Sequence, residues 1–249
     1  MSDDSNNSST GMGSSDATSA NSGPSASRAF VISGLVALVV VAVVSGIGLT
    51  AKTDGARSGT AAECADSGIN CTVGDVGPGG GKIFYAATTS FSCPSVAGDN
   101  ATCKYLEVAP DDWNGAAGDA ANLRWSAPLN PTVAVTNIAL NQIGQGRINA
   151  SRILAAQAPA TRDTPNSVRK VSDYRGGAKS DWFLPSGDEL YQLYLVRSQV
   201  GNFAADFYWS SSVGAAAGAN VREVNFASGS RGLVNGESTY DNFRPVRAF

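Results

Sequence analysis

The chain has 249 residues, which is enough for one medium-sized domain or two small ones. Its net charge of −3 gives no support for nucleic-acid binding, whose footprint is a basic domain. It contains no histidine, so Ser-His-Asp catalysis, Cys-His catalysis and His-ligated zinc sites are excluded. Catalysis by lysine, carboxylate or thiol side chains is not excluded.

The first 63 residues fall into three segments of different composition. Residues 1–28 are rich in Ser, Asn, Gly and Asp, and are predicted to be a disordered tail because they bury too little to offset ordering entropy. Residues 29–51 contain no charge and centre on GLVALVVVAVV, which is long enough for one transmembrane helix. The alternative, a cleaved signal peptide, normally has its charged region near the chain start and a shorter apolar core. Residues 52–63 form a polar linker, and residues 64–249 the predicted domain.

All four cysteines lie near the start of this domain, as two closely spaced pairs, Cys64 with Cys71 and Cys93 with Cys103. Each pair is suited to closing a small loop, and an even count in a Gly- and Ser-rich domain predicts two disulfides. Four free thiols or a zinc site are the alternatives, although no C-x-x-C spacing is present.

Two signals for membrane orientation disagree. Arg28 precedes the apolar segment whereas Lys52 and Arg57 follow it, and the positive-inside rule alone favours a cytoplasmic C-terminal part. Disulfides, however, require an oxidising compartment. We therefore expect a single-pass protein of the cell membrane, with a cytoplasmic N-terminus and an extracytoplasmic C-terminal domain.

The domain begins with a glycine-rich segment, VGDVGPGGGKIFY over residues 73–85. A phosphate-binding loop needs G-x-x-x-x-G-K-[ST], but Val76 and Ile83 stand at the first glycine and hydroxyl positions. The segment is therefore predicted to be a tight turn before a strand over residues 82–86, and a second strand is expected over residues 104–109.

Two helices are predicted in the middle of the domain. Asn149 is a suitable N-cap for a helix that continues through Ile153 and Leu154. A second helix is expected over residues 167–174.

A strand that turns directly into a helix follows. Residues 181–184, DWFL, are a short strand candidate that Pro185 would end. Ser186 and Glu189 match the S-x-x-E capping box. The apolar face of this helix would consist of Leu190, Leu193 and Tyr194.

The C-terminal part reads as a meander of strands. They are expected over residues 207–210, 221–226, 231–234 and 243–249. Helices in the first half and strands at the end predict an α+β fold.

Seven sequence blocks occur here in the order that they take in the Lcl C-terminal domain family, which is named after a bacterial collagen-like adhesin. The blocks are VGDVGPGGGKIFY, YLEVAP, IGQGRIN, YRGGAKSDWFLPSGDELYQLY, YWSSS, NFASG and FRPVRAF. The chain resembles this family over residues 71–249, and the family is similar to the formylglycine-generating, sulfatase-modifying variant of the C-type-lectin-like fold. The resemblance implies a C-type-lectin-like α+β domain whose two ends lie close together, preceded here by a single transmembrane helix and a disordered tail.

Activity does not carry over with a fold. The formylglycine-generating enzymes depend on a cysteine pair late in the domain, whereas this chain has no cysteine after Cys103. Calcium-dependent lectins use Glu-Pro-Asn or Gln-Pro-Asp followed by Trp-Asn-Asp, and neither set is present. We therefore expect no enzyme activity, no cofactor and no metal site.

The resemblance and the charge distribution predict a membrane-anchored, surface-exposed adhesion module. Between residues 147 and 179, seven basic side chains stand against two acidic ones, and such a cluster attracts sulfated or phosphorylated polymers. An ordinary solvated helix face is the alternative. Trp182 and Trp209 are candidates for stacking on sugars, although core packing is the commoner use of tryptophan. The candidate ligand-binding residues are Arg169, Lys170, Arg175, Lys179, Asp181, Trp182 and Trp209.

Two other functions stay open. An envelope protein–protein interaction domain would bind another surface protein and show an exposed apolar patch. A carboxylate-based enzyme would need two facing carboxylates in a cleft; its candidates are Asp181, Asp188 and Glu189, or Asp111 and Asp112. Capping and helix-dipole roles already explain Asp188 and Glu189. The expected partners are an anionic glycan, a cell-envelope polymer or another surface protein, together with the membrane through one helix, and no nucleic acid.

Overall fold

The computed structural model describes residues 61–115, 119–128, 140–157, 163–214 and 220–249. The chain divides into two units, Met1–Thr53 and Asp54–Phe249, and every described element belongs to the second. The helices are α1 (Ala61–Ser67), α2 (Gly146–Ala156), α3 (Ser167–Ser172), the 3-10 turn η3 (Gly176–Ala178), α4 (Gly187–Leu195) and α5 (Arg197–Val200). The strands are β1 (Lys82–Ser92), β2 (Thr102–Val108), β3 (Ala120–Leu123), β4 (Phe207–Val213), β5 (Asn220–Asn225), β6 (Arg231–Asn235), β7 (Asp241–Phe243) and β8 (Val246–Ala248). The predicted α+β fold is confirmed.

The predicted tail, the transmembrane segment and most of the linker lie outside the described residues. Within the part of the chain that the structure describes, no helix is long and apolar enough to cross a membrane. The first described helix, α1, begins at Ala61, slightly before the predicted domain boundary at residue 64.

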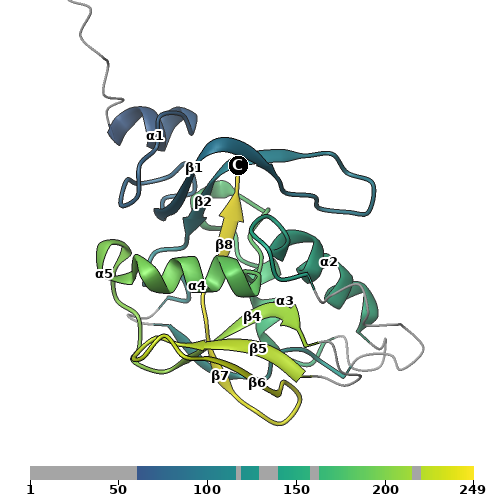
Figure 1. The fold of residues 1–249 in the computed structure, drawn as a ribbon. Coiled ribbons are helices and arrows are strands. Elements are labelled where there is room, and N and C mark those ends of the chain that lie inside the picture. The colour runs from purple at the N-terminus through teal and green to yellow at the C-terminus, as the bar shows by residue number, and fades with distance from the viewer. Residues whose placement is uncertain (1–60, 116–118, 129–139, 158–162, 215–219) are drawn as a thin grey trace, which may run out of the picture. The chain divides into compact units, whose positions relative to one another are not determined.

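The strands form two sheets. The smaller has the order β1-β2-β8 and the larger has the order β3-β7-β4-β5-β6. The closing strand β8 runs antiparallel to β2, with Ala248 opposite Leu106. The backbone N–H groups of Lys104 and Tyr105 donate to the carbonyl of Phe249 at 2.8 and 2.9 Å. The end of the chain therefore lies beside the first long strands of the domain (Figure 1).

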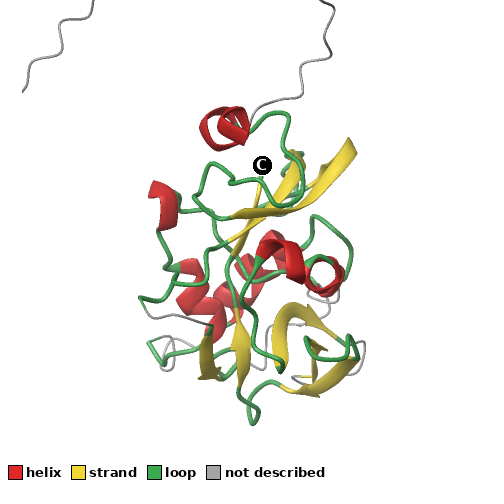
Figure 2. Ribbon diagram, turned by 90° about the vertical axis from the view of Figure 1, so that its left-hand side faces the viewer, coloured by secondary structure: helices red, strands yellow, loops and turns green. Residues whose placement is uncertain are grey.

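Helix α4 lies between the two sheets (Figures 1 and 2). It begins with the predicted capping box, which is confirmed: the Ser186 hydroxyl accepts from the Glu189 N–H at 3.3 Å, and the Glu189 carboxylate accepts from the Ser186 N–H at 2.7 Å. This reciprocal pair satisfies two backbone donors that a helix start would otherwise leave without partners.

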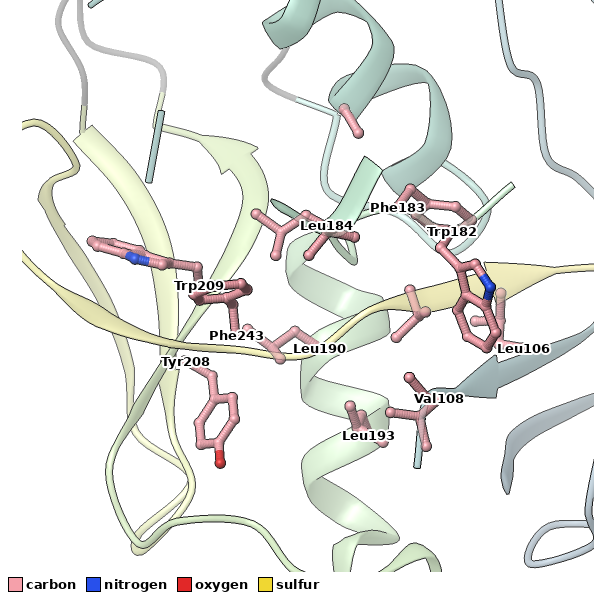
Figure 3. Packing of buried hydrophobic residues seen from close by; sticks show 14 of the residues in the cluster. Leu106, Val108, Trp182, Phe183, Leu184, Leu190, Leu193, Tyr208, Trp209 and Phe243 are labelled. Carbon is pink, nitrogen blue, oxygen red and sulfur yellow. The ribbon is translucent and has the colours of Figure 1, made fainter. Parts of the chain in front are cut away.

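The core is continuous from one sheet to the other through α4. Its Leu190 and Leu193 are buried. In Figure 3 Leu190 approaches Phe243 of β7, and Leu193 approaches Val108 of β2. Fully burying one such side chain stabilises the fold by about 1.5–3 kcal/mol, so a single helix holds both sheets to one core.

Strands β1 and β4 extend past their predicted ends at residues 86 and 210, and two other predicted strands are wrong. Within residues 181–184 only Phe183 pairs, as an isolated bridge with Val246 of β8. The predicted strand over residues 243–249 is two strands, β7 and β8, in different sheets. The chain crosses from one sheet to the other at Arg244 and Pro245, where the proline has no N–H for a strand ladder.

The start of α2 also differs from the prediction, because Gln145 and not Asn149 is its N-cap. Asn149 lies inside the helix, and its side-chain amide donates to the carbonyl of Leu140 at 2.7 Å. The earlier start depends on Gly146, whose Cβ would come within 2.7 Å of the Ser186 nitrogen. Only glycine allows the start of α2 to pack this closely against the start of α4.

Both predicted disulfides are present and exclude the free-thiol and zinc alternatives. Cys64 and Cys71 are joined with their Cα atoms 4.9 Å apart, and Cys93 and Cys103 with theirs 5.8 Å apart. The first bond lies in a small cluster with Tyr105 and the second in the main core.

Candidate ligand-binding site

Both tryptophans that were candidates for sugar stacking belong to the core. Trp182 is 3% exposed and Trp209 is 0% exposed. Their indole N–H groups donate to backbone carbonyls, that of Trp182 to Gly176 and that of Trp209 to Leu123, both at 3.1 Å. Figure 3 shows the two rings on opposite sides of α4. Trp209 has no ring face to offer a ligand, which corrects that prediction, and Trp182 reaches the surface only as part of a groove wall.

Asp181 is held in an ion pair. The Nε and Nη2 atoms of Arg247 donate to its two carboxylate oxygens at 3.0 and 3.1 Å. The Nη1 atom of the same buried arginine donates to Glu107 at 3.1 Å. A bidentate contact fixes the orientation of a carboxylate and offsets its charge. The Asp181 side chain is therefore held rigidly, and Arg247 neutralises most of its negative charge.

The glycine-rich loop binds an anion, and this anion is the carboxylate of Glu107. The N–H groups of Gly79 and Gly81 donate to Glu107 Oε1 at 2.9 and 2.7 Å. A Cβ at Gly77 would lie 2.6 Å from the carboxyl carbon, so the loop closes on the acid only without side chains. Backbone N–H groups arranged in this way form an anion nest. The Glu107 carboxylate occupies this nest, so the nest is not open to a phosphate. The structure therefore agrees with the sequence analysis, which excluded a phosphate-binding loop.

The predicted basic cluster is divided in space. Arg169 is half-buried and turns toward α2, where its Nη2 donates to Gln157 at 3.2 Å. Lys179 is half-buried after η3. Lys170 and Arg175 are exposed, whereas Arg162 lies outside the described residues.

Lys170 and Arg175 meet at a surface hollow of about 260 Å³, which we call the basic hollow. Its lining residues are Trp113, Asn114, Lys170, Asp173, Tyr174 and Arg175. The guanidinium of Arg175 is fixed at the rim, because its Nη1 donates to the carbonyls of Ser172 and Tyr174, both at 2.8 Å. Among the lining residues, two cationic side chains stand against the one carboxylate of Asp173, and Asp112 lies near Tyr174.

Trp113 forms part of the floor of this hollow. The residue is 7% exposed, and its indole nitrogen is buried without a hydrogen-bond partner among the described residues. Its ring meets that of Tyr174 edge to face, with centroids 5.6 Å apart. A buried N–H without an acceptor carries a desolvation penalty of about 1–3 kcal/mol. Burial, with Asp112 and Glu107 nearby, raises the pKa of Tyr174, so its phenol stays protonated.

A second depression, of about 350 Å³, lies along α2, and we call it the α2 groove. Arg147 of α2 lines one side, and Asp181 and Trp182 line another. The wall formed by residues 95–96 is rigid, because Asp99 accepts from the backbone N–H and the hydroxyl of Ser95 at 2.9 and 2.8 Å. These bonds lower the pKa of Asp99.

Four of the five carboxylates that were candidates for catalysis have structural partners, whereas Asp112 is exposed. Asp188 accepts from Asn141 at 2.7 Å and pairs with the exposed Arg231 at 3.3 Å. Glu189 is fully buried and also accepts from the Gly144 N–H at 2.8 Å. Burial raises the pKa of Glu189 to about 7, against the lowering effect of its backbone donors. Asp111 accepts from the side chain of Asn202.

One acidic pair was not foreseen. Glu223 of β5 and Asp241 of β7 hydrogen-bond one another, and one oxygen of Asp241 is buried without a further partner. Burial, with Asp241 and Asp206 adding, raises the pKa of Glu223 to about 8. These residues are far apart in the sequence, and no motif links them. The adjoining cavity holds only about 20 Å³, room for a single water and not for a substrate.

Across the described ranges, no group of three or more Cys, Asp or Glu side chains is placed to hold a metal ion. In comparisons with known proteins, no family model matches the chain and no curated protein matches it.

Proposed function

We propose that this chain is a membrane-anchored, non-catalytic binding module of the bacterial surface, and that its basic hollow recognises an anionic glycan or a cell-envelope polymer. The observation that carries the proposal is the convergence of Lys170 and Arg175 on one hollow that Trp113 also lines. Guanidinium and ammonium groups are both charged donors, and such donors suit sulfate, phosphate or carboxylate groups.

The arrangement of the sheets supports the C-type-lectin-like part of the proposal. The strand that closes the chain, β8, pairs with the early strand β2, as the sequence resemblance implies for the two ends of the domain. The capped helix α4 follows the WFLP segment and packs into the centre of the fold.

The disulfides support an extracytoplasmic position. Both bonds form with favourable Cα separations, and such bonds persist in oxidising compartments. In this proposal residues 29–51 anchor the protein in the membrane, and the short N-terminal tail stays in the cytoplasm.

A protein partner and an enzyme are supported less well. The large exposed apolar side chains come from separate elements, including Ile69 before β1, Leu195 of α4 and Leu233 of β6. Of the paired acids Glu223 and Asp241, Glu223 lines a cavity that is too small for a substrate. Binding to a polar polymer therefore fits the described surface best.

The test is a binding panel with the full-length chain in mild detergent, run at low and high ionic strength. Heparin and a polyphosphate-bearing wall polymer are the anionic probes, and dextran is the neutral one. We expect both anionic probes to bind at low salt and to weaken at high salt, because exposed charges are screened. No binding at low salt, or binding that salt leaves unchanged, would overturn the proposal.

A further inference from the structure

The basic hollow and the α2 groove meet at the end of α3. Ser172 lines the groove, whereas the next two residues, Asp173 and Tyr174, line the hollow. Beneath the surface, contacts between aromatic rings also link the two depressions. The ring of Tyr174 contacts Trp113 of the hollow with centroids 5.6 Å apart, and it contacts Trp182 of the groove with centroids 5.1 Å apart. A narrow wall on a rigid aromatic base therefore separates the two depressions.

The two depressions offer different chemistry. The hollow presents the cations Lys170 and Arg175. The groove presents Arg147, together with the serine hydroxyls of Ser151 and Ser180. Because a hydroxyl both donates and accepts, such a lining suits the hydroxyl groups of a sugar. An acidic group and a neighbouring sugar ring would therefore find suitable partners on the two sides of one wall.

We infer that the two depressions form one extended site, and that its ligand is an acidic oligosaccharide or polymer that occupies both. This inference rests on the proposed function. It adds that the ligand must be long enough to reach both depressions. A single sugar lies on one side of the Ser172–Tyr174 wall and fills one depression. Once a longer chain is bound in the hollow, its contact with the groove becomes intramolecular, and the overall affinity rises steeply without any new contact type.

The test is a titration of the full-length chain with size-fractionated heparin oligosaccharides at low ionic strength. We expect the affinity for an octasaccharide to exceed that for a disaccharide by about 100-fold or more, as for two linked contacts. Lys170→Gln in the hollow and Arg147→Gln in the groove should each lower octasaccharide affinity by about tenfold, the loss of one charged contact. The disaccharide should respond to only one of the two variants.

Lys104→Gln is the matched control, because Lys104 lines a different depression beside Phe249. It should leave all affinities unchanged. Equal affinity for short and long oligosaccharides, or a loss from only one variant at every length, would overturn the extended site and leave the proposed function standing. Failure of every length to bind the unmodified protein would instead remove the proposed function itself.

Discussion

Glu107 and Arg247 lie opposite one another on β2 and β8, and their side chains form a buried ion pair at 3.1 Å. The same carboxylate accepts from the N–H groups of Gly79 and Gly81, and the same guanidinium holds Asp181 at the α2 groove. Three distant segments, the glycine-rich loop, the closing strand and the groove wall, are therefore fixed by one network.

Glu107→Ala should destabilise the domain by about 3–5 kcal/mol, because it leaves the glycine loop without its anion and the buried Arg247 with Asp181 as its one carboxylate partner. Urea unfolding of the unmodified and variant chains measures this loss. Glu237→Ala at an exposed position is the control, with an expected cost below about 0.5 kcal/mol. Similar losses from the two substitutions would contradict a structural role for the network.

The Glu223–Asp241 pair should make the protein less stable as the pH rises. The Glu223 carboxyl has a pKa of about 8 in the folded protein and about 4.3 in the unfolded chain. The folded state therefore binds this proton more tightly, so the contribution is complete below about pH 4 and is lost as the pH rises through about 8.

Glu223→Gln mimics the protonated acid and should flatten this dependence. We expect a gain on the order of 1 kcal/mol at pH 8, which is about 2–4 °C in Tm, and little change near pH 4. Melting curves of the unmodified chain and the variant across this range measure the effect, with the exposed Glu237→Gln as control. A variant that melts lower at pH 8 and equally at pH 4 would show that the pair is stabilising as an anion.

Ser186→Ala should cost about 1–2 kcal/mol through loss of the α4 cap. The hydroxyl also donates to the carbonyl of Gln142 at 2.8 Å, and the variant leaves that acceptor without this donor. Chemical denaturation measures the loss, and Ser228→Ala at an exposed turn is the comparison. Affinity for an anionic polymer should not change, so a variant that folds normally but no longer binds would place Ser186 in the ligand site.

Replacing Cys93 and Cys103 by serine should lower stability by about 2–3 kcal/mol, because a closed loop of this size restricts the unfolded chain. The matching replacement of Cys64 and Cys71 should cost less, since that bond closes a shorter loop in a smaller cluster. Thermal unfolding compares the two variants. Mass spectrometry of the unmodified protein should detect no free thiol, and four free thiols would refute both bonds.

The features that the sequence predicts correctly are local. The capping box needs only the spacing between Ser186 and Glu189 and the preference of a hydroxyl for a helix N-terminus. Each disulfide closes a short loop, so proximity along the chain was a sufficient guide. The hairpin of β5 and β6 was likewise predicted from the Gly- and Ser-rich turn between two short strands.

The features that the sequence does not reveal depend on contacts between distant segments. Arg244 lies in the block that closes the chain, and nothing local indicates that it pairs with Asp119. No local motif marks Trp113, and only the fold shows that it lines the same hollow as Lys170. Trp209 lies between Tyr208 and Ser210 on β4, and every residue of this strand after Phe207 is buried, so its ring is enclosed.

The most direct test of the central claim is the affinity of the full-length chain for heparin across a salt series, compared between two double variants. Lys170→Gln with Arg175→Gln removes both cations of the basic hollow. Lys104→Gln with Arg124→Gln removes two exposed charges elsewhere. We predict at least a tenfold loss of affinity and a shallower salt dependence for the first variant only. Equal affinities for the two variants and the unmodified chain would contradict a ligand site in the basic hollow.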